Sequence, residues 1–324
     1  MLARPVNAPR PEDPLVSIVV PVFEEEGCIA ELARRVLRAL AGSTARYELL
    51  FVDDGSRDQT PERIADLQAV DPRVCTIRFT RNFGHQAALA AGLRYARGDL
   101  VVTMDGDLQH PPELLPRLLE AWRAGADVVH TRRQLPPGSR AGAKERLGRA
   151  FYRAITRLSG VPIQPAGADF RLLDRRVVDA FNRLDEYFVF VRGLVPWLGF
   201  REAVVEYEVG PRFAGRSKYR LSPMLRLASD GIVAFSILPL RLITLLGLVT
   251  TVAGLGYGLF WVAAYLAGRV EEAGLTSIVV LLLVFGGVQL LSLGIVSEYV
   301  GRTYEEVKRR PRYVIDSVRG IDAP

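Results

Sequence analysis

Two aspartates separated by one glycine stand at the end of a short apolar run, and a glutamine follows two residues later: Asp105, Asp107 and Gln109. Residues at i, i+2 and i+4 of an extended segment lie on one face, so these side chains offer oxygen ligands from one side. Mg²⁺ and Mn²⁺ prefer such ligands and are often completed by substrate phosphates. A divalent ion would also compensate the repulsion between the two carboxylates. The spacing favours a metal site, and the alternative is an acidic turn that caps a helix beginning near Pro111.

A second acidic pair, Asp53-Asp54, follows another apolar run and precedes Gly55. The pair fits an ordinary turn. It also fits a binding role, because a carboxylate there could accept hydrogen bonds from a nucleobase or a ribose. The sequence contains no Gly-Lys-Ser/Thr phosphate loop, and no Gly-x-Gly-x-x-Gly follows a predicted strand. A nucleotide bound to this chain would therefore be held without either of those loops.

The elements that position these residues alternate between strands and helices. Apolar runs typical of buried strands occur at 17–22, 47–52, 75–79, 100–104 and 128–130. Helical patterns lie between them, at 29–40, from Thr60 onward and at 86–96. This order predicts an α/β domain with a mostly parallel sheet covered on both faces, in which ligands bind at the carboxyl ends of the strands. The polar segments 24–26, 53–54, 81–82 and 105–109 all follow predicted strands.

Two apolar runs near the C-terminus, 242–267 and 275–296, contain no charged residue. Each exceeds the roughly 20 residues that span a bilayer, and a buried helical hairpin is the alternative. Basic residues concentrate outside the pair, which predicts that both ends lie in the cytoplasm. The preceding segment, 221–240, mixes apolar and charged residues and fits an interfacial amphipathic helix or an ordinary surface helix.

The net charge of +6 is carried almost entirely by arginine. Arginine favours phosphate contacts, so the charge fits nucleic acid, lipid headgroups or a nucleotide, although arginine-rich codon usage would also produce it. The apolar runs argue against a nucleic-acid binder. The predicted organisation is a disordered, proline-rich lead-in at 1–15, a soluble domain at 16–220, interfacial helices at 221–240, two spans within 241–297 and a basic cytoplasmic tail at 298–324.

Seven segments occur in an order that resembles the polyprenyl-phosphate glycosyltransferases, a family that includes bactoprenol glucosyltransferases and dolichol-phosphate mannose synthases. They are SIVVPVFEEE, VDDGSRDQT, RNFGHQAALAAGL, GDLVVTMDGDLQHPPE, ADFRLLDRRVVDA, VRGLVPWLGF and RFAGRSKY. The resemblance covers about residues 17–241, and the two-span segment resembles the bactoprenol branch. It implies a GT-A nucleotide-sugar fold. It also implies an inverting, metal-dependent transfer of a sugar from a nucleotide diphosphate to the phosphate of a lipid carrier.

The resemblance also implies roles for individual residues. The residues implied to bind the donor are Pro21, Phe23, Glu25, Asp53, Asp54 and Arg81. The residues implied to bind Mg²⁺ or Mn²⁺ are Asp105, Asp107 and Gln109. The residues implied to be catalytic are Asp105, Asp107 and Asp169. The residues implied to bind the acceptor phosphate are Arg132, Lys144, Arg212, Arg216, Ser217 and Lys218. The chain departs from the family at Glu24, where asparagine is usual, and at Glu145, where arginine is frequent.

Several of these residues have a second interpretation. Asp169, implied as the general base, could instead pair with Arg171 or Arg175. The basic residues near the membrane could bind lipid headgroups. We expect a structural or solvent-facing role for His85 and a loop position for His110. A phosphate acceptor is largely dianionic at neutral pH because its second pKa is about 6. It needs little deprotonation, so Asp169 could orient the acceptor or its cations as much as take a proton.

The expected function is transfer of glucose from UDP-glucose to a polyprenyl phosphate on the cytoplasmic face of a bacterial plasma membrane, by a multi-pass protein with both termini in the cytoplasm. GDP-mannose or a UDP-amino sugar are alternative donors. A processive polysaccharide synthase is disfavoured because the sequence has no Gln-x-x-Arg-Trp. The alternative outside the enzymes is an inactive membrane scaffold or a lipid-carrier transport partner. Two spans form a thin anchor, so we expect a homo-oligomer, with a tetramer as one candidate.

Overall fold

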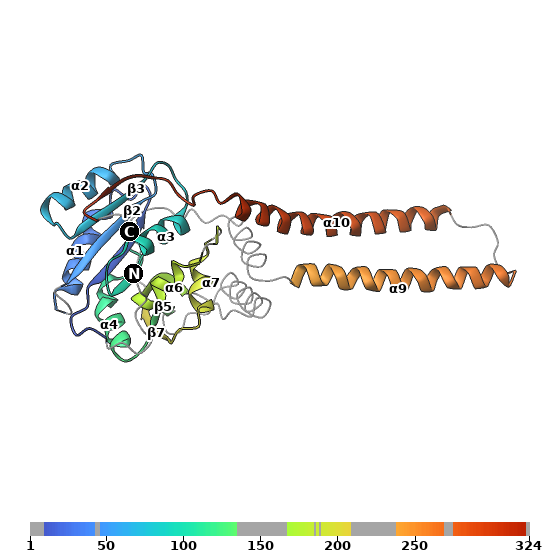
Figure 1. The fold of residues 1–324 in the computed structure, drawn as a ribbon, viewed down its shortest axis with the longest axis horizontal. Coiled ribbons are helices and arrows are strands. Elements are labelled where there is room, and N and C mark those ends of the chain that lie inside the picture. Colours follow the sequence, from blue (N-terminus) through green and yellow to red (C-terminus); the bar gives the residue numbers. More distant parts are fainter. Residues whose placement is uncertain are drawn as a thin grey trace. The chain divides into compact units, whose positions relative to one another are not determined.

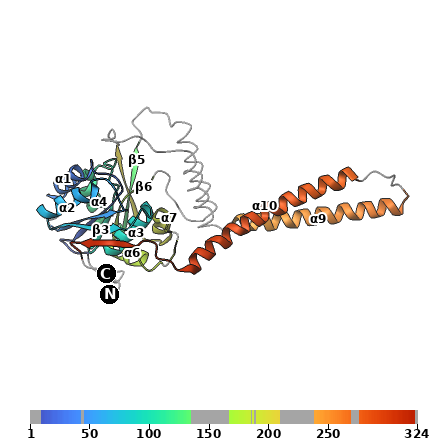
Figure 2. The same cartoon turned by 90° about the horizontal axis from the view of Figure 1, so that it is seen from above.

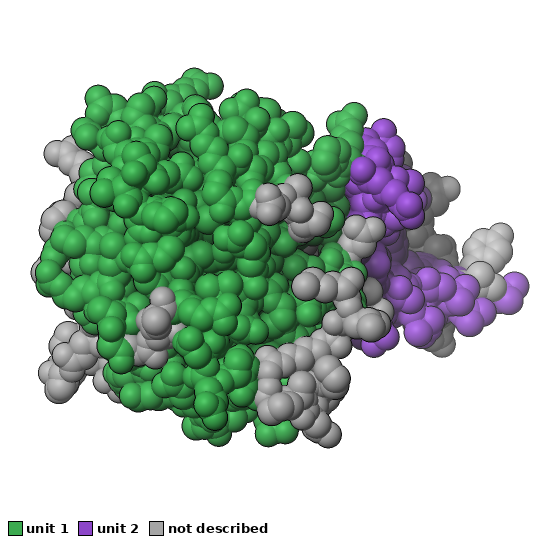
Figure 3. Space-filling view, turned by 60° about the vertical axis from the view of Figure 1, so that its left-hand side comes forward, with its two compact units in different colours: residues 1–225, 310–324 green, residues 226–309 purple. Residues whose placement is uncertain are grey.

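The computed structural model of the protein describes residues 10–42, 46–134, 167–184, 186–187, 189–208, 238–268 and 275–321. The chain divides into two compact units, one formed by residues 1–225 with 310–324 and the other by residues 226–309 (Figure 3). The first unit holds the α/β domain, and the second holds the two long apolar helices.

An eight-stranded sheet forms the centre of the described part of the first unit (Figure 1). The strand order of this sheet is β7-β5-β6-β4-β1-β2-β3-β8. Its strands are β1 (Val16–Val22), β2 (Tyr47–Asp53), β3 (Val74–Phe79), β4 (Leu100–Thr103), β5 (Val128–Gln134), β6 (Gly167–Asp174), β7 (Glu202–Glu208) and β8 (Ile315–Arg319). The run β4-β1-β2-β3 is parallel. The predicted mostly parallel α/β sheet is therefore confirmed.

Helices cover both faces of the sheet. They are α1 (Ile29–Leu40), α2 (Thr60–Val70), α3 (His85–Tyr95), η1 (Pro112–Leu114), α4 (Leu115–Arg123), α6 (Arg175–Phe181) and α7 (Val191–Trp197). Helix α1 buries Ile29, Leu32 and Val36 in the main core, together with alternate residues of β1. Helix α3 packs on the other face, where Gly92 lies against Val19 of β1. Both faces of β1 and β2 are thus buried, which explains their mainly apolar sequences.

The fifth predicted strand does not lie beside the fourth. Strand β6 is inserted between them and runs antiparallel to both β4 and β5, while β7 pairs in parallel with β5. Strands β6 and β7 were not predicted from the sequence. Strand β6 contains Asp169 and Arg171, two buried charged residues that a search for apolar runs passes over.

The segment at 298–324, predicted to be a basic tail, is ordered over most of its described length. Helix α10 continues to Lys308, and β8 pairs antiparallel with β3 (Figure 2). Thr80 N–H donates to the carbonyl of Val314 at 3.1 Å, and the rings of Phe79 and Tyr313 stack at 4.9 Å. The prediction of a simple tail is wrong for β8, because this strand closes one edge of the sheet.

The predicted lead-in at 1–15 is also corrected for its last residues. Arg10 forms an ion pair with Asp127 at 3.0 Å, and its guanidinium lies 4.9 Å from the ring of Trp122. Leu15 N–H donates to Asp99 at 2.9 Å. Residues 10–15 are therefore fixed against the sheet domain and are not disordered.

The second unit consists of α9 (Leu238–Leu266) and α10 (Leu275–Lys308) in its described part. Both helices are long and apolar enough to cross a membrane, over Pro239–Trp261 and Val284–Lys308. The two predicted apolar runs are thus confirmed as long helices, and α10 extends beyond the predicted end at Val296. In the predicted interfacial segment at 221–240, residues 221–237 lie outside the described residues.

Candidate active site

The carboxyl ends of the parallel strands open onto a cavity of about 500 Å³. Its lining comes from the loops after β1, β2, β3 and β4, together with β6 and α7. The side chains that matter for chemistry are Phe23, Glu25, Asp54, Asn82, His85, Asp105, Asp107, Asp169 and Arg192. Polar segments that lie far apart in the sequence therefore meet at one edge of the sheet, as expected for a parallel α/β domain.

Asp105 and Asp107 reach this cavity from the turn that follows β4. Gly106 between them is required for close packing, since a Cβ there would lie 2.8 Å from Cγ1 of Val22. Asp107 accepts a hydrogen bond from the backbone N–H of Gln109 at 3.1 Å, and the Gln109 amide also contacts the Asp107 carboxylate. The structure thus brings both aspartates to the cavity, whereas Gln109 is not part of its lining.

His85 stands between two acidic residues of the site. Its Nε2 lies 3.5 Å from Oδ1 of Asp105 and 3.3 Å from Oδ2 of Asp169. Ligand atoms of these three residues all lie within 4.8 Å of one another, so two carboxylates and an imidazole could share one divalent ion. The His85 side chain is 42% exposed, as expected for a solvent-facing residue, and it also contacts both acidic residues of the site. His110 packs beside the same site, with its ring stacked on Phe170 at 5.6 Å.

Asp169 is a buried carboxylate held by two arginines. Arg171 donates to Oδ1 at 3.0 Å, and Arg192 donates its Nε and Nη2 to both carboxylate oxygens at 2.9 and 2.7 Å. Burial by itself would raise the pKa of Asp169, but hydrogen bonds from His85 and Arg192 and the charges of both arginines hold that pKa well below its usual range. Asp169 is therefore a permanently charged group at neutral pH.

The alternative in which Asp169 pairs with a nearby arginine is found for Arg171 but not for Arg175. Arg175 instead donates to the backbone carbonyls of Ala96 and Gly98, both at 2.8 Å. Arg171 is fully buried, and burial lowers its pKa while the charge of Asp169 raises it. Arg171 and Asp169 therefore form a buried ion pair in which each charge compensates the other.

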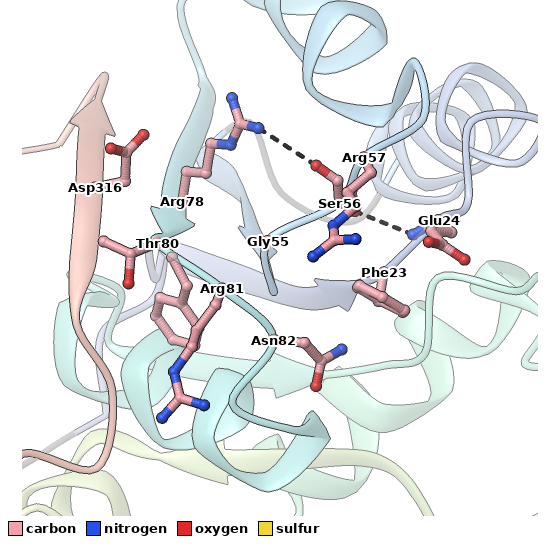
Figure 4. Close-up of a pocket in the computed structure, with 11 residues that line it drawn as sticks. Phe23, Glu24, Gly55, Ser56, Arg57, Arg78, Thr80, Arg81, Asn82 and Asp316 are labelled. Atoms are coloured by element: carbon pink, nitrogen blue, oxygen red, sulfur yellow. Dashed lines mark hydrogen bonds between the residues drawn. The ribbon is translucent and has the colours of Figure 1, made fainter.

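A second cavity of about 470 Å³ adjoins the first and shares Phe23 and Asn82 with it. Figure 4 shows its polar lining, which includes Glu24, Ser56, Arg57, Arg78, Thr80, Arg81 and Asp316. The guanidinium groups come from the loop after β2, from β3 and from the loop after β3. This cavity offers several donors for carbonyl or phosphate oxygens next to the acidic site.

The acidic pair after β2 supports the loops of both cavities. Asp53 is buried, accepts the backbone N–H of Ser56 at 2.9 Å and lies 3.4 Å from Nε of Arg78. Asp54 accepts the backbone N–H groups of Phe83 and Gly84 at 2.6 and 2.9 Å, and burial raises its pKa. Asp54 therefore fixes the start of α3, which carries His85.

Gly55 is a position where only glycine fits. Its φ is +74°, and an added Cβ would lie 2.5 Å from the backbone carbonyl carbon of Arg81. We expect Gly55→Ala to lower the free energy of unfolding by about 2–3 kcal/mol, from the strain of positive φ and from overpacking. Gly199→Ala is the matched control, because Gly199 has a φ of +70° and nothing within 4 Å of an added Cβ. Equal losses for the two variants in urea unfolding would show that the contact with the Arg81 backbone is unimportant.

The residues assigned to the acceptor phosphate are only partly described. Arg132 lies in β5 and forms an ion pair with Glu206 of β7. Lys144, Arg212, Arg216, Ser217 and Lys218 lie outside the described residues.

The residues assigned to donor binding all lie at or beside the two cavities. Pro21, Phe23, Glu25 and Asp54 line the first cavity, and Phe23 and Arg81 line the second. Asp53 supports the second cavity through Ser56 and Arg78.

The residues that line these cavities without a predicted site role include His85, Arg192 and Asp316, together with Arg57, Arg78 and Asn82. The first two stand in the segments RNFGH and VRGLVPWLGF, where they were noticed without a site role. No sequence pattern indicated a site role for Asp316, because this residue stands in a short polar strand far from the other motifs.

Comparison with known proteins identifies the family. Residues 17–181 match glycosyl transferase family 2, and residues 238–303 match the GtrB C-terminal hairpin. The chain is 42% identical over 308 residues to the uncharacterized glycosyltransferase YkcC of Bacillus subtilis, covering 94% of each chain. It is 39% identical over 300 residues to the bactoprenol glucosyl transferase of Shigella phage SfII, covering 93% of this chain and 97% of that one.

A solved structure of glucosyl-3-phosphoglycerate synthase from Mycobacterium tuberculosis, in complex with Mn²⁺, UDP-glucose and phosphoglyceric acid, has a TM-score of 0.46. Its sequence is 19% identical, and the match covers 68% of this chain and 79% of that one. The resemblance to polyprenyl-phosphate glycosyltransferases is confirmed by the family match and the curated relatives. The chain belongs to glycosyl transferase family 2 and is a glycosyltransferase whose sheet domain is followed by a GtrB-type hairpin.

Proposed function

We propose that this chain transfers glucose from UDP-glucose to the phosphate of a polyprenyl carrier on the cytoplasmic face of a bacterial plasma membrane. The observation that carries the proposal is the pairing of an acidic cavity, which contains Asp105, Asp107 and Asp169, with an adjoining arginine-lined cavity. The same chain carries two helices able to cross a membrane. The names of relatives such as the phage bactoprenol glucosyl transferase support the choice of sugar and carrier.

Each of the two cavities would bind a different part of the nucleotide-sugar donor. In our proposal the nucleoside enters the arginine-lined cavity, where Phe23 offers an aromatic face and Arg81 a hydrogen-bond donor. The diphosphate and the sugar then lie in the acidic cavity. Asp105 and Asp107 would hold Mg²⁺ or Mn²⁺ there. His85 and Asp169 lie close enough to Asp105 to contribute further ligand atoms. A bound divalent ion would supply Lewis-acid stabilisation of the departing nucleoside diphosphate.

The reaction replaces one bond at the anomeric carbon. An oxygen of the acceptor phosphate forms a bond to this carbon, the bond to the nucleoside diphosphate breaks, and the configuration inverts. The acceptor needs little deprotonation, because a phosphate monoester has a second pKa of about 6. Asp169 remains charged and is engaged by Arg171 and Arg192. We propose that Asp169 orients Arg192, while Arg132, Lys144, Arg212, Arg216, Ser217 and Lys218 bind the acceptor phosphate.

Transfer of radiolabelled sugar tests the proposed reaction. Full-length protein in detergent is mixed with undecaprenyl phosphate, Mn²⁺ and one labelled donor from UDP-glucose, GDP-mannose or UDP-N-acetylglucosamine. We expect label to enter the lipid phase from UDP-glucose only, and EDTA to abolish this transfer. Label from another donor would contradict the proposed sugar, and no label from any donor would favour an inactive scaffold or transport partner.

Membrane topology and assembly belong to the same proposal. Basic residues flank the two apolar runs on their outer sides, which supports cytoplasmic positions for both termini. Two helices provide a thin anchor, so we propose a homo-oligomer, with a tetramer as one candidate. Mass measurement of the full chain in lipid nanodiscs would separate a monomer from an oligomer.

A further inference from the structure

The cavity that we assign to the donor nucleoside has a wall contributed by the C-terminal strand. Asp316 of β8 lines this cavity together with Arg78 and Arg81, although it follows them by more than two hundred positions in the numbering. Figure 4 shows Asp316 on β8, beside the side chains of Arg78 and Thr80. The sequence match to glycosyl transferase family 2 ends at residue 181, so this wall lies outside the matched segment.

An irregularity in strand pairing places the Asp316 side chain. The register of β3 and β8 joins Arg78 to Ser317 and Phe79 to Ile315, which leaves Asp316 as the extra residue between them. Such a bulge interrupts the ladder and redirects a side chain, and bulges of this kind are common next to binding sites. The strand is therefore shaped so that a carboxylate stands at the cavity.

The strand around Asp316 is firmly attached to the sheet. The Sγ of Cys75 lies 3.0 Å from the carbonyl oxygen of Gly320, a residue 245 positions away. Gln68 donates to the carbonyl of Arg319 at 3.5 Å, and Tyr313 stacks on Phe79. None of these contacts uses the Asp316 side chain. The carboxylate can thus be changed without removing what holds β8 in place.

The charges in the cavity restrict what can bind beside Asp316. Arg57, Arg78 and Arg81 supply hydrogen-bond donors, whereas Glu24 and Asp316 supply acceptors. Arg78 is partly engaged by Asp53 and by the carbonyl of Ser56 at 3.3 Å. Among the described residues, the structure records no ion pair or hydrogen bond to the Asp316 carboxylate. This carboxylate is therefore exposed at the cavity and open to a ligand.

Guanidinium donors and a carboxylate acceptor together match a base that carries carbonyl oxygens beside a ring N–H. Uracil and guanine have this pattern, whereas cytosine and adenine present a ring nitrogen that is itself an acceptor. We propose that Asp316 is a specificity-determining residue that accepts a hydrogen bond from the donor's base and disfavours cytosine and adenine. This inference rests on the proposed function, because it requires the cavity to hold the nucleoside of the sugar donor.

Nucleotide binding to the full-length protein in detergent, with Mn²⁺ present, tests this assignment. The Kd values of UDP, GDP, CDP and ADP are measured by calorimetry for wild type, Asp316→Asn, Asp316→Glu and Ser317→Ala. We expect Asp316→Asn to weaken binding of the preferred nucleotide by about tenfold, as for loss of a charge-assisted hydrogen bond. Its preference over CDP should fall by a similar factor. Asp316→Glu keeps the charged acceptor and should retain the preference over CDP, and Ser317→Ala should stay within threefold of wild type.

Transfer kinetics and melting temperature complete the test. Asp316→Asn should raise the KM for the donor about tenfold and leave kcat within threefold, with an unchanged melting temperature. The inference is overturned if Asp316→Asn binds every nucleotide within twofold of wild type, or if Ser317→Ala weakens binding equally. If wild-type protein transfers sugar and Asp316→Asn behaves identically, only this inference fails. If wild-type protein binds no nucleoside diphosphate, the proposed function fails as well.

Discussion

Replacing Asp105 with asparagine is expected to lower the kcat of sugar transfer by at least about 10³-fold. Asp105 lines the acidic cavity and contributes a ligand atom to the one cluster found among the described residues that could hold a divalent ion. A metal at such a site stabilises transition-state charge by several kcal/mol, and about 1.4 kcal/mol corresponds to a tenfold rate change. Mn²⁺ affinity, measured by electron paramagnetic resonance in the presence of UDP, should fall in the same variant.

The fold should tolerate this change. The Asp105 side chain is 31% exposed, and the substitution removes one of two neighbouring carboxylates at the site. Asp66→Asn on the exposed surface of α2 removes the same charge away from the cavity and serves as the matched control. A variant of Asp105 that retained activity within tenfold and bound Mn²⁺ normally would show that the metal is held elsewhere.

Asp169→Asn is expected to lower the free energy of unfolding by about 3 kcal/mol. Arg171 is fully buried, and loss of its partner leaves an uncompensated charge in the interior. The folded-state pKa of Asp169 lies below its unfolded value of about 3.9. The stabilisation is therefore present above that pH and is lost as the pH falls through the folded-state pKa. Thermal and urea unfolding at pH 7 would measure the loss.

A double variant separates stability from chemistry. Replacing a buried ion pair with uncharged groups of similar size is often close to neutral, so Asp169→Asn combined with Arg171→Met should recover most of the lost stability. Activity of this folded double variant then reports on Asp169 itself. A loss of only a few-fold supports the orienting role, whereas a loss above about 10³-fold restores the general base. Unchanged stability in Asp169→Asn would contradict the importance of the ion pair.

The sequence contained enough information to predict the parallel half of the sheet. Strands β1 and β2 are buried along their whole length, so their sequences are mainly apolar, with Ser17 and Glu48 as the polar exceptions before Asp53. The turn after β4 is also predictable from local sequence, because the spacing of Asp105 and Asp107 around Gly106 is set by adjacent residues. The two apolar helices were predictable for the same reason, since length and composition alone make them candidates to cross a membrane.

The antiparallel half of the sheet was not predictable in this way. Strand β6 buries the charges of Asp169 and Arg171, which is acceptable only because each compensates the other and Arg192 arrives from α7. Strand β8 is short and half polar, and its pairing with β3 depends on contacts across most of the chain. Such pairing has no local sequence signal, because its energy comes from residues far away in the sequence.

The sequence by itself therefore determined the type of chemistry: two aspartates after a strand, in a chain with two long apolar helices. Only the tertiary structure decided which side chains share the site. It placed His85 between Asp105 and Asp169, engaged Asp169 with two arginines, and set Asp316 at the wall of the neighbouring cavity. The physical reason is that charge compensation and strand pairing act through space, whereas turn chemistry and apolar periodicity act along the chain.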